Sequence, residues 1–590
     1  MSANPSLSSI DASASEITTS EYPVYDLIVR RATLVDGTRA PARVADVGIH
    51  DGRIVAIASG DGVLNARADQ EVDAQGLLMT PGWVDIHTHY DGQVTWDPDV
   101  TPSSWHGVTT LVMGNCGVGF APVRPGSEQF LIELMEGVED IPGTALSEGI
   151  AWTWESFPEY LDAVDSMPRV LDVAAQVPHA ALRAYVMGER AHEDPTVEEI
   201  AAMARLAEEG LRAGAVGFST SRTILHRSKH GLVPGTNAVP DELLAICEAI
   251  ARVGHRVVEM VGDDGPNEAA DGWLGEVARR TGATVTYALA QNPGQPQGYR
   301  GALEQASQLQ MEGLRVVPQV SNRPTGMLFG FRSSLHPFVT HPTYRSLLNR
   351  PFAERIAALR DPAIRRQLVE EGPSTDKRIA LSLMTRWEQM FPLGDPPDYE
   401  PPYESSAKAE AARRGCRPEE VMLDWMLERD GEALIFVPLA SYAEHNHDAI
   451  RELMTHPSTV LGLSDGGAHC GLICDASMPS YLLTHWVRDR RRGERISLED
   501  AVHLQTQRTA SVYGLNDRGS IELGKRADFN LIDLAALRLH EPEMVYDLPA
   551  NGRRLVQRVD GYRATFVRGV QTFADGSPTG ARPGRLVRAS

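Results

Sequence analysis

The sequence predicts an α/β protein built on a (β/α)8 TIM-type barrel, with a small β-sandwich assembled from both chain ends and a helical insertion before the last barrel strand. Three observations predict this fold. Eight short apolar runs alternate with amphipathic stretches rich in Ala and Glu, as parallel strands and helices do in a barrel. Short β-branched runs separated by Gly and Asp turns occur near both chain ends. About 135 residues separate the seventh apolar run from the eighth, too many for a simple loop.

The two chain ends carry the predicted sandwich. Residues 1–24 are polar and partly acidic, without a basic or apolar leader region, so we expect a disordered N-terminal arm rather than a signal peptide. Residues 25–80 contain runs such as "YDLIVRRATLVDG" and predict the first part of the sandwich. Residues 516–590, which include "GSIELGKRADFNLIDL", return to short strands and predict its second part and a C-terminal tail.

The middle of the chain carries the predicted barrel. Residues 81–325 contain seven apolar runs: WVDIH, VTTLVMG, VLDVAAQV, AVGFST, RVVEMVG, ATVTYAL and RVVPQV. The eighth, STVLGLSDGG, lies in 456–515 with the helices that follow it. Residues 326–455 predict an insertion or lid plus a barrel helix. An open doubly wound sheet is the alternative, but no GxGxxG follows a first strand.

Composition excludes several classes of protein. A formal net charge of −23 and a pI of about 5.3 argue against nucleic acid and anionic membranes as partners, because both require a basic surface. No apolar run is long enough for a transmembrane helix. Five cysteines without a framework spacing indicate reduced thiols, so we expect a cytoplasmic protein. A homo-oligomer is compatible with the sequence, but its composition does not define the oligomeric state.

Two histidines and an aspartate form the candidate active site. In "TPGWVDIHTHYDG", strand alternation places His87 and His89 on one face, at the carboxyl end of the first strand, where barrel active sites lie. Asp465, in "VLGLSDGGAH", ends the eighth strand, which is next to the first in a closed barrel. The three could bind a metal ion, with Asp465 as a general base. The alternatives are two hydrogen-bonded loop histidines and a turn aspartate; His469 is a candidate substrate contact.

These motifs resemble those of a known family. "PGWVDIHTHYDGQ", "GVTTLVMGNCGVGFAPV", "GLSDGGAH" and "GAVGFSTSRTILHRSKHGLVPGT" together look like the amidohydrolase superfamily, in its D-aminoacylase-like (N-acyl-D-amino-acid deacylase) branch. The resemblance implies a barrel with a metal, usually zinc, and hydrolysis of an amide by metal-activated water. It implies that His87, His89 and Cys116 are ligands and that Asp465 takes the proton. Alternatively, Cys116 is a small buried thiol.

The sequence departs from the family pattern on strands five and six. The family has a histidine at the carboxyl end of each of these strands, whereas here they read "RVVEMVGDDG" and "TVTYALAQNPG". Glu259 could replace the first histidine, because zinc accepts carboxylate oxygen. The second has no obvious substitute, so we expect one zinc ion rather than two.

Other polar residues are weaker candidates. Arg222, His226 and Arg227 form a basic cluster after strand four and could bind a substrate carboxylate, or could belong to a solvated loop. Tyr287 on strand six could contact substrate or pack in the core. A second HxH motif, at His445 and His447, is expected on the surface or a lid, and the charged run 488–495 on a solvated helix face.

The sequence therefore predicts a metal-dependent amidohydrolase that cleaves the C–N bond of a small-molecule amide, such as an N-acyl-D-amino acid or a peptide-like amide. One alternative keeps the fold and acts on a cyclic or xenobiotic amide or ester. A second alternative is a metal-free, non-catalytic relative that binds or assembles. The presence of His87, His89 and Asp465 together favours the enzyme.

Overall fold

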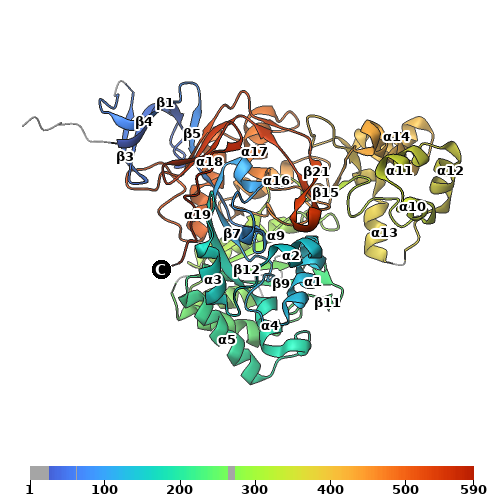
Figure 1. Cartoon of the computed structure of the whole chain (residues 1–590), viewed down its shortest axis with the longest axis horizontal. Helices are drawn as coiled ribbons and strands as arrows, with labels where there is room; N and C mark the ends of the chain where they lie inside the picture. Colours follow the sequence, from blue (N-terminus) through green and yellow to red (C-terminus); the bar gives the residue numbers. More distant parts are fainter. Residues whose placement is uncertain (1–24, 61–62, 255, 264–272, 376, 590) are drawn as a thin grey trace, which may run out of the picture.

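The computed structural model describes residues 25–60, 63–254, 256–263, 273–375 and 377–589. The arm expected for residues 1–24 lies outside the described residues. Three bodies are visible in Figure 1: a β-rich module, a barrel with its helices, and a helical lobe.

The barrel consists of eight parallel strands, and each coincides with one of the predicted apolar runs. In chain order they are β6 (Trp83–Asp85), β7 (Val108–Met113), β8 (Asp172–Pro178), β9 (Gly217–Arg222), β12 (Val257–Gly262), β13 (Thr284–Ala288), β14 (Val316–Val320) and β18 (Val460–Leu461). The first and last strands meet just beyond their carboxyl ends, where Thr88 bridges to Gly466 and the His89 amide donates to the Gly466 carbonyl. The barrel is therefore joined beyond the carboxyl ends of its first and last strands, and the predicted fold class is confirmed.

Helices cover the outside of the barrel. They are α1 (Glu128–Glu139), α2 (Gly143–Gly149), α3 (Phe157–Ser166), α4 (His179–Met187), α5 (Val197–Arg212), α6 (Pro240–Ala251), α8 (Trp273–Thr281), α9 (Gly298–Met311), α16 (Asp448–Thr455), α17 (Met478–Tyr481), α18 (Leu498–Gln505) and α19 (Gln507–Val512). The π-helix Leu482–Asp489 continues α17. Helix α5 illustrates why they form: Thr196 and Glu199 make a reciprocal capping box, and Met203, Ala207 and Leu211 are buried on one stripe.

The β-rich module is built from both chain ends, as predicted. Its nine-stranded sheet combines β1 (Tyr25–Leu34), β2 (Arg43–His50), β3 (Arg53–Ser59), β4 (Ala68–Asp73) and β5 (Leu78–Pro81) with β19 (Phe529–Ile532), β24 (Tyr562–Val567), β25 (Val570–Ala574) and β26 (Ser577–Pro578). The antiparallel pair β5–β19 joins the two halves. Apolar residues from both halves, such as Val29 and Phe529, share one core.

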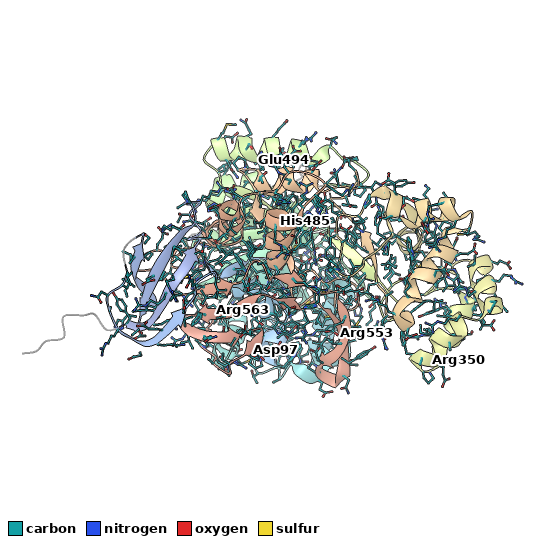
Figure 2. The ribbon with its side chains drawn as sticks, turned by 90° about the horizontal axis from the view of Figure 1, so that it is seen from above. Asp97, Arg350, His485, Glu494, Arg553 and Arg563 are labelled. Carbon is teal, nitrogen blue, oxygen red and sulfur yellow. The ribbon has the colours of Figure 1, made fainter. Side chains whose placement is uncertain are left out.

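The predicted insertion forms a lobe with its own core. It contains strands β15 (Gly326–Phe329), β16 (Phe391–Pro392) and β17 (Ile435–Pro438) and helices α10 (Pro342–Leu347), α11 (Phe352–Leu359), α12 (Pro362–Glu371), α13 (Arg378–Met384), α14 (Ala407–Arg414) and α15 (Pro418–Met426). Its buried residues, among them Phe338, Leu359 and Met422, pack mainly on one another. Seen from above, the lobe that carries Arg350 projects from the rest of the molecule (Figure 2).

Two C-terminal segments pack against the barrel and its loops. The hairpin β21 (Glu543–Leu548) and β22 (Gly552–Val556) reaches the loop after β18, where the Leu555 amide donates to the Cys470 carbonyl. The tail lies against the barrel, where the Val587 amide donates to the Val173 carbonyl. Two short pairs, β10 (Arg227–Ser228) with β11 (Gly231–Leu232) and β20 (Arg538–Leu539) with β23 (Val559–Asp560), complete the strands. Within the described ranges, no helix has both the length and the apolar character needed to cross a membrane.

Candidate metal centre

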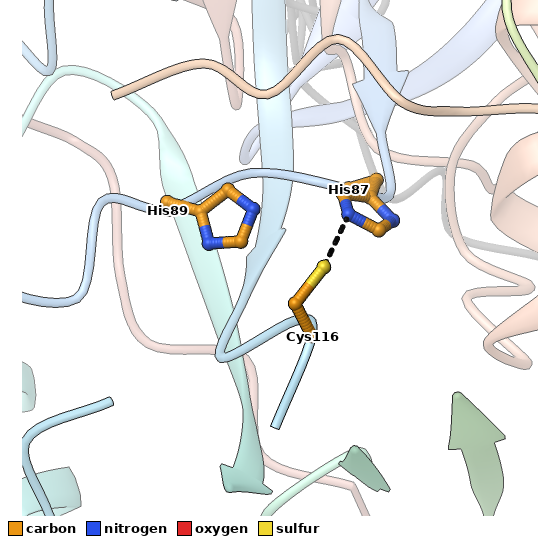
Figure 3. Close-up of side chains that lie close together, drawn as sticks. All are labelled: His87, His89 and Cys116. Carbon is orange, nitrogen blue, oxygen red and sulfur yellow. Dashed lines mark hydrogen bonds between the residues drawn. The ribbon is translucent and has the colours of Figure 1, made fainter. Parts of the chain in front are cut away.

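The two histidines of the first HxH motif lie together at the carboxyl end of β6. Both are 1% exposed, and their ring centroids are 5.5 Å apart. The His87 Nε2 atom lies 3.3 Å from the sulfur of Cys116. One ligand atom from each of the three residues falls within 4.8 Å of the others. Figure 3 shows both imidazoles and the thiol converging on one point.

Cys116 is positioned by a left-handed turn after β7. Its φ is 57°, and Gly114 and Gly117 on either side also have positive φ. The Cys116 amide donates to Oε2 of Glu259 at 2.9 Å. Glu259, fully buried on β12, therefore supports the turn that presents the thiol, and its Oε1 lies 3.9 Å from Nδ1 of His87.

Asp465 completes the group from the opposite side, after β18. Its Oδ1 lies 3.4 Å from Nε2 of His87 and 3.7 Å from Nε2 of His89. Burial opposes ionisation of Asp465, but the neighbouring imidazoles of His89, His87 and His469 hold its pKa well below the usual range. The carboxylate is therefore ionised at neutral pH.

The tautomer of His87 suits metal binding. Its Nδ1 lies 3.0 Å from Oε1 of Gln319, a carbonyl oxygen that accepts only. Nδ1 therefore carries the proton, and the lone pair on Nε2 points at Cys116 and Asp465. Metal-bound histidines use their second nitrogen in this way.

The charge of the site also favours a cation. Burial raises the pKa of Glu259 and of Asp91 to about 7, and raises that of the Cys116 thiol well above its usual range, with further contributions from the surrounding carboxylates. Glu259 Oε1 is buried and has no hydrogen-bond partner among the described residues. A divalent cation would relieve this crowding of acids and deprotonate the thiol. Two imidazoles, a thiolate and a carboxylate are donors that zinc accepts, so these residues fit a zinc ion.

Comparisons with known proteins agree with this geometry. A family model described as the amidohydrolase family (Amidohydro_3) matches residues 70–573. The chain belongs to the amidohydrolase family. It is thus a hydrolase acting on amide C–N bonds, and the resemblance seen in the sequence is confirmed.

Individual relatives of this amidohydrolase match along nearly its whole length. D-aminoacylase from Alcaligenes xylosoxydans xylosoxydans is 27% identical over 96% of this chain and 98% of its own. A crystal structure of D-aminoacylase has a TM-score of 0.63 at 22% identity, covering 96% of this chain and 100% of the other. A structure of N-acyl-D-glutamate deacylase from Bordetella bronchiseptica, in complex with zinc and a phosphonate inhibitor, has a TM-score of 0.61 at 24% identity, with the same coverage. The two structural likenesses establish the fold.

Two predicted substrate contacts, His226 and His469, lie on the loops after β9 and β18. His226 accepts or donates a hydrogen bond with Ser221, 3.0 Å away, and burial lowers its pKa to about 3, with His469 and His89 contributing. His469 has a positive φ and lies within 3.5 Å of Glu139. His469 thus contacts Glu139, which also lies beside His89, and His226 is close enough to His469 and His89 for their charges to lower its pKa.

Three other predicted contacts do not join this cluster. Strand register pairs Ser219 with Glu259, which faces the barrel interior, so Arg222 faces outward, where it donates to the Ala238 carbonyl. Tyr287 pairs with Met260, next to Glu259, and by the same alternation it faces outward into the core around the barrel. Arg227 is exposed on β10.

The second HxH motif was expected on the surface or a lid, but of its two histidines only His445 is partly exposed. His447 is fully buried, and Nε2 donates to the Tyr399 carbonyl at 2.8 Å, while its amide donates to Glu400. Arg490, from the run expected to be solvated, is 2% exposed and donates to both oxygens of Glu400. Each residue is buried because it meets Glu400 from a distant part of the chain.

Sequence reasoning missed two residues that contact the histidines of the candidate centre. Gln319 is a lone polar residue near the carboxyl end of an apolar strand, and strand alternation could have identified it. Glu139, whose carboxylate lies 3.3 Å from Nδ1 of His89, is at the end of helix α1 and offered no such signal.

Proposed function

We propose that this chain is a zinc-dependent deacylase of N-acyl-D-amino acids or closely related peptide-like amides. One observation carries the proposal: His87, His89, Cys116 and Asp465 bring two imidazoles, a thiol and an ionised carboxylate to one point at the carboxyl end of the barrel. The relatives that bear the names D-aminoacylase and N-acyl-D-aspartate deacylase, at 27% and 26% identity, support the substrate class.

Each residue has a distinct part in hydrolysis. His87, His89 and Cys116 would hold the ion, with Asp465 as a further ligand. Zinc bound there would polarise the amide carbonyl and make a water molecule a better nucleophile. Asp465 would accept the proton of the attacking water and return it to the leaving amine nitrogen, which yields a carboxylic acid and a free amine.

The substrate side is formed by His226 and His469. His226 contacts Ser221 and His469 contacts Glu139, and each imidazole would offer a hydrogen-bond donor to the carboxylate or the carbonyl of an N-acylamino acid. Arg227, exposed on the hairpin that follows His226, would attract an anionic substrate to the mouth of the site. We include Glu259 as support for Cys116 and as a candidate ligand through its unpaired Oε1.

We infer one zinc ion rather than two. In the described chain, His87, His89 and Cys116 form a compact ligand group, whereas the ends of β12 and β13 bring Glu259 but no histidine to it. We also infer a cytoplasmic, reducing environment, because all five cysteines are free and a zinc-binding thiol must stay reduced. Neither nucleic acid nor membrane is proposed as a partner, and a homo-oligomer is compatible with this function.

A metal analysis combined with a substrate panel tests the proposal. We expect one zinc per chain, loss of hydrolysis after chelation, and recovery when zinc is returned. We expect N-acetyl-D-amino acids to be hydrolysed and their L-enantiomers to be poor substrates. Hydrolysis of cyclic or xenobiotic amides alone would support a changed substrate within the same fold. Absence of stoichiometric metal together with no zinc-dependent hydrolysis would refute the enzyme and favour a binding protein.

A further inference from the structure

Glu139 enters the metal centre from the end of a helix rather than from a barrel strand. It is the last residue of α1, which ends at Asp140 in a left-handed conformation. The Asp140 carboxylate accepts from the Gly471 amide, and the Glu139 carbonyl accepts from the His469 amide. The end of α1 is thus fastened to the loop that follows Asp465, and Glu139 is left 1% exposed.

The carboxylate of Glu139 lies between two imidazoles. Its Oε1 is 3.3 Å from Nδ1 of His89, and its Oε2 is 3.5 Å from Nε2 of His469. Both atoms are buried, their alignment does not make a hydrogen bond between them, and neither has another hydrogen-bond partner among the described residues. Buried polar atoms normally have a polar partner. Because these two atoms are neighbours and have no other, we interpret them as partners of each other.

The two ligand histidines are held by different acceptors. His87 has a neutral amide oxygen, from Gln319, at its second nitrogen, whereas His89 has a carboxylate. A carboxylate at this position fixes the tautomer and the ring orientation and makes the other nitrogen a better metal ligand. His89 should therefore depend on its acceptor more than His87 does.

We propose that Glu139 is a positioning residue that holds His89 in its ligand orientation and ties it, through the same carboxylate, to His469 on the substrate side. This inference rests on the proposed function, because it gives Glu139 a task only if His89 binds zinc. One buried group would then connect the first strand of the barrel to the loop after the last strand.

The test measures zinc affinity directly, by competition with a chromophoric chelator. Glu139→Gln keeps the size of the side chain and removes its charge, and we expect zinc to bind about 10–100-fold more weakly. Glu139→Asp keeps the charge, and we expect an affinity closer to wild type than that of the Gln variant. Glu133→Gln, in the same helix but paired with Lys229 and His230, is the matched control and should bind zinc as wild type does.

A second readout separates positioning from general damage. In cobalt-substituted protein, Glu139→Gln should change the ligand-field absorption, which depends on ligand geometry, and keep the thiolate-to-cobalt band from Cys116. His469→Gln should raise KM and leave zinc affinity within about threefold of wild type. Equal zinc affinities and spectra for wild type and Glu139→Gln would overturn the inference.

His87→Ala separates this inference from the proposed function. If that variant loses zinc while Glu139→Gln does not, the metal site stands and only the role of Glu139 is refuted. If His87→Ala also retains zinc, the proposed function itself fails, and the inference fails with it.

Discussion

Two buried clusters of this amidohydrolase contain the same kinds of side chain but differ in charge. At the carboxyl end of the barrel, His87 and His89 face several acids and a thiol, and no arginine or lysine contacts them among the described residues. At the base of the insertion, His447 and His485 face Glu400, and Arg490 donates to both oxygens of that carboxylate. The first cluster has an excess of negative charge, whereas the second is already neutralised.

This difference shows how residue type alone misleads. Both clusters bring ligand atoms within 4.8 Å of one another. In the second, however, His447 donates to a backbone carbonyl, and the Glu400 oxygens accept from Arg490 and from the His447 amide. A cation placed there would have to displace an arginine. We therefore interpret the second cluster as an ion-pair network that fastens the insertion to the barrel, and the first as a metal site.

The most direct test of the difference between the two clusters is to remove one histidine from each. His87→Ala should lose its zinc and all measurable amide hydrolysis, because a ligand and the point of convergence disappear. His447→Ala should keep one zinc per chain. Elemental analysis of the two purified variants measures the difference, and loss of zinc from His447→Ala alone would reverse the assignment of the two clusters.

Asp465→Asn sharpens the assignment within the metal centre. Asparagine keeps an oxygen for zinc but cannot accept a proton, so kcat should fall by about 10²–10⁴ while zinc remains bound. Steady-state kinetics and metal content are measured on the same preparation. A variant with bound zinc and near wild-type kcat would show that another group moves the proton.

The fold and the strand that carries His87 and His89 were predictable because they depend on local periodicity. Apolar runs identified all eight barrel strands, and alternation placed His87 and His89 on one face. The assignment of Cys116 depended on the family resemblance, because nothing in its local spacing distinguishes a ligand from a small buried thiol.

The remaining features depend on contacts between distant segments. His447 is buried because it meets Glu400, 47 residues away in the sequence, and no local pattern reports that contact. Glu139 reaches the site only because α1 ends against the loop after Asp465. Arg222 and Tyr287 were placed in strands correctly, but the sequence does not say which face of the strand points into the barrel. The facing direction follows only once a neighbour of known orientation, such as Glu259, is identified.

The ion-pair network can be tested through stability. Arg490→Met leaves Glu400, which is 3% exposed, as a buried carboxylate without its main partner. Removing one member of such a pair typically costs about 3–5 kcal/mol, so the thermal midpoint should drop sharply while zinc content stays unchanged. Arg413→Met removes an exposed arginine that pairs with Glu410 and should leave the midpoint unaltered. Equal midpoints for the two variants would show that Arg490 is not structural.

The smallest expected effect is a pH dependence of opposite sign in the two clusters of the zinc-free protein. Arg490 and His485 overcome the effect of burial and hold the pKa of Glu400 below its usual value of 4.5, so its stabilising contribution is present above that pH and is lost as pH falls through the lower folded pKa. Burial raises the pKa of Glu259 to about 7. The group is therefore neutral below pH 4.5 and does not oppose folding there, whereas its ionisation lowers stability as the pH rises towards 7.

Two isosteric variants separate these contributions. Glu400→Gln should flatten the loss of thermal midpoint on the acid side, and Glu259→Gln should flatten the loss between about pH 5 and 8, each by an amount worth about 1–3 kcal/mol. Thermal midpoints of chelator-treated protein across pH 3 to 8 measure both slopes against wild type. Because zinc would stabilise the ionised acids around it, adding zinc should abolish the Glu259 slope and leave the Glu400 slope in place. If both substitutions removed a pH dependence of the same sign, the two clusters would not differ in charge balance.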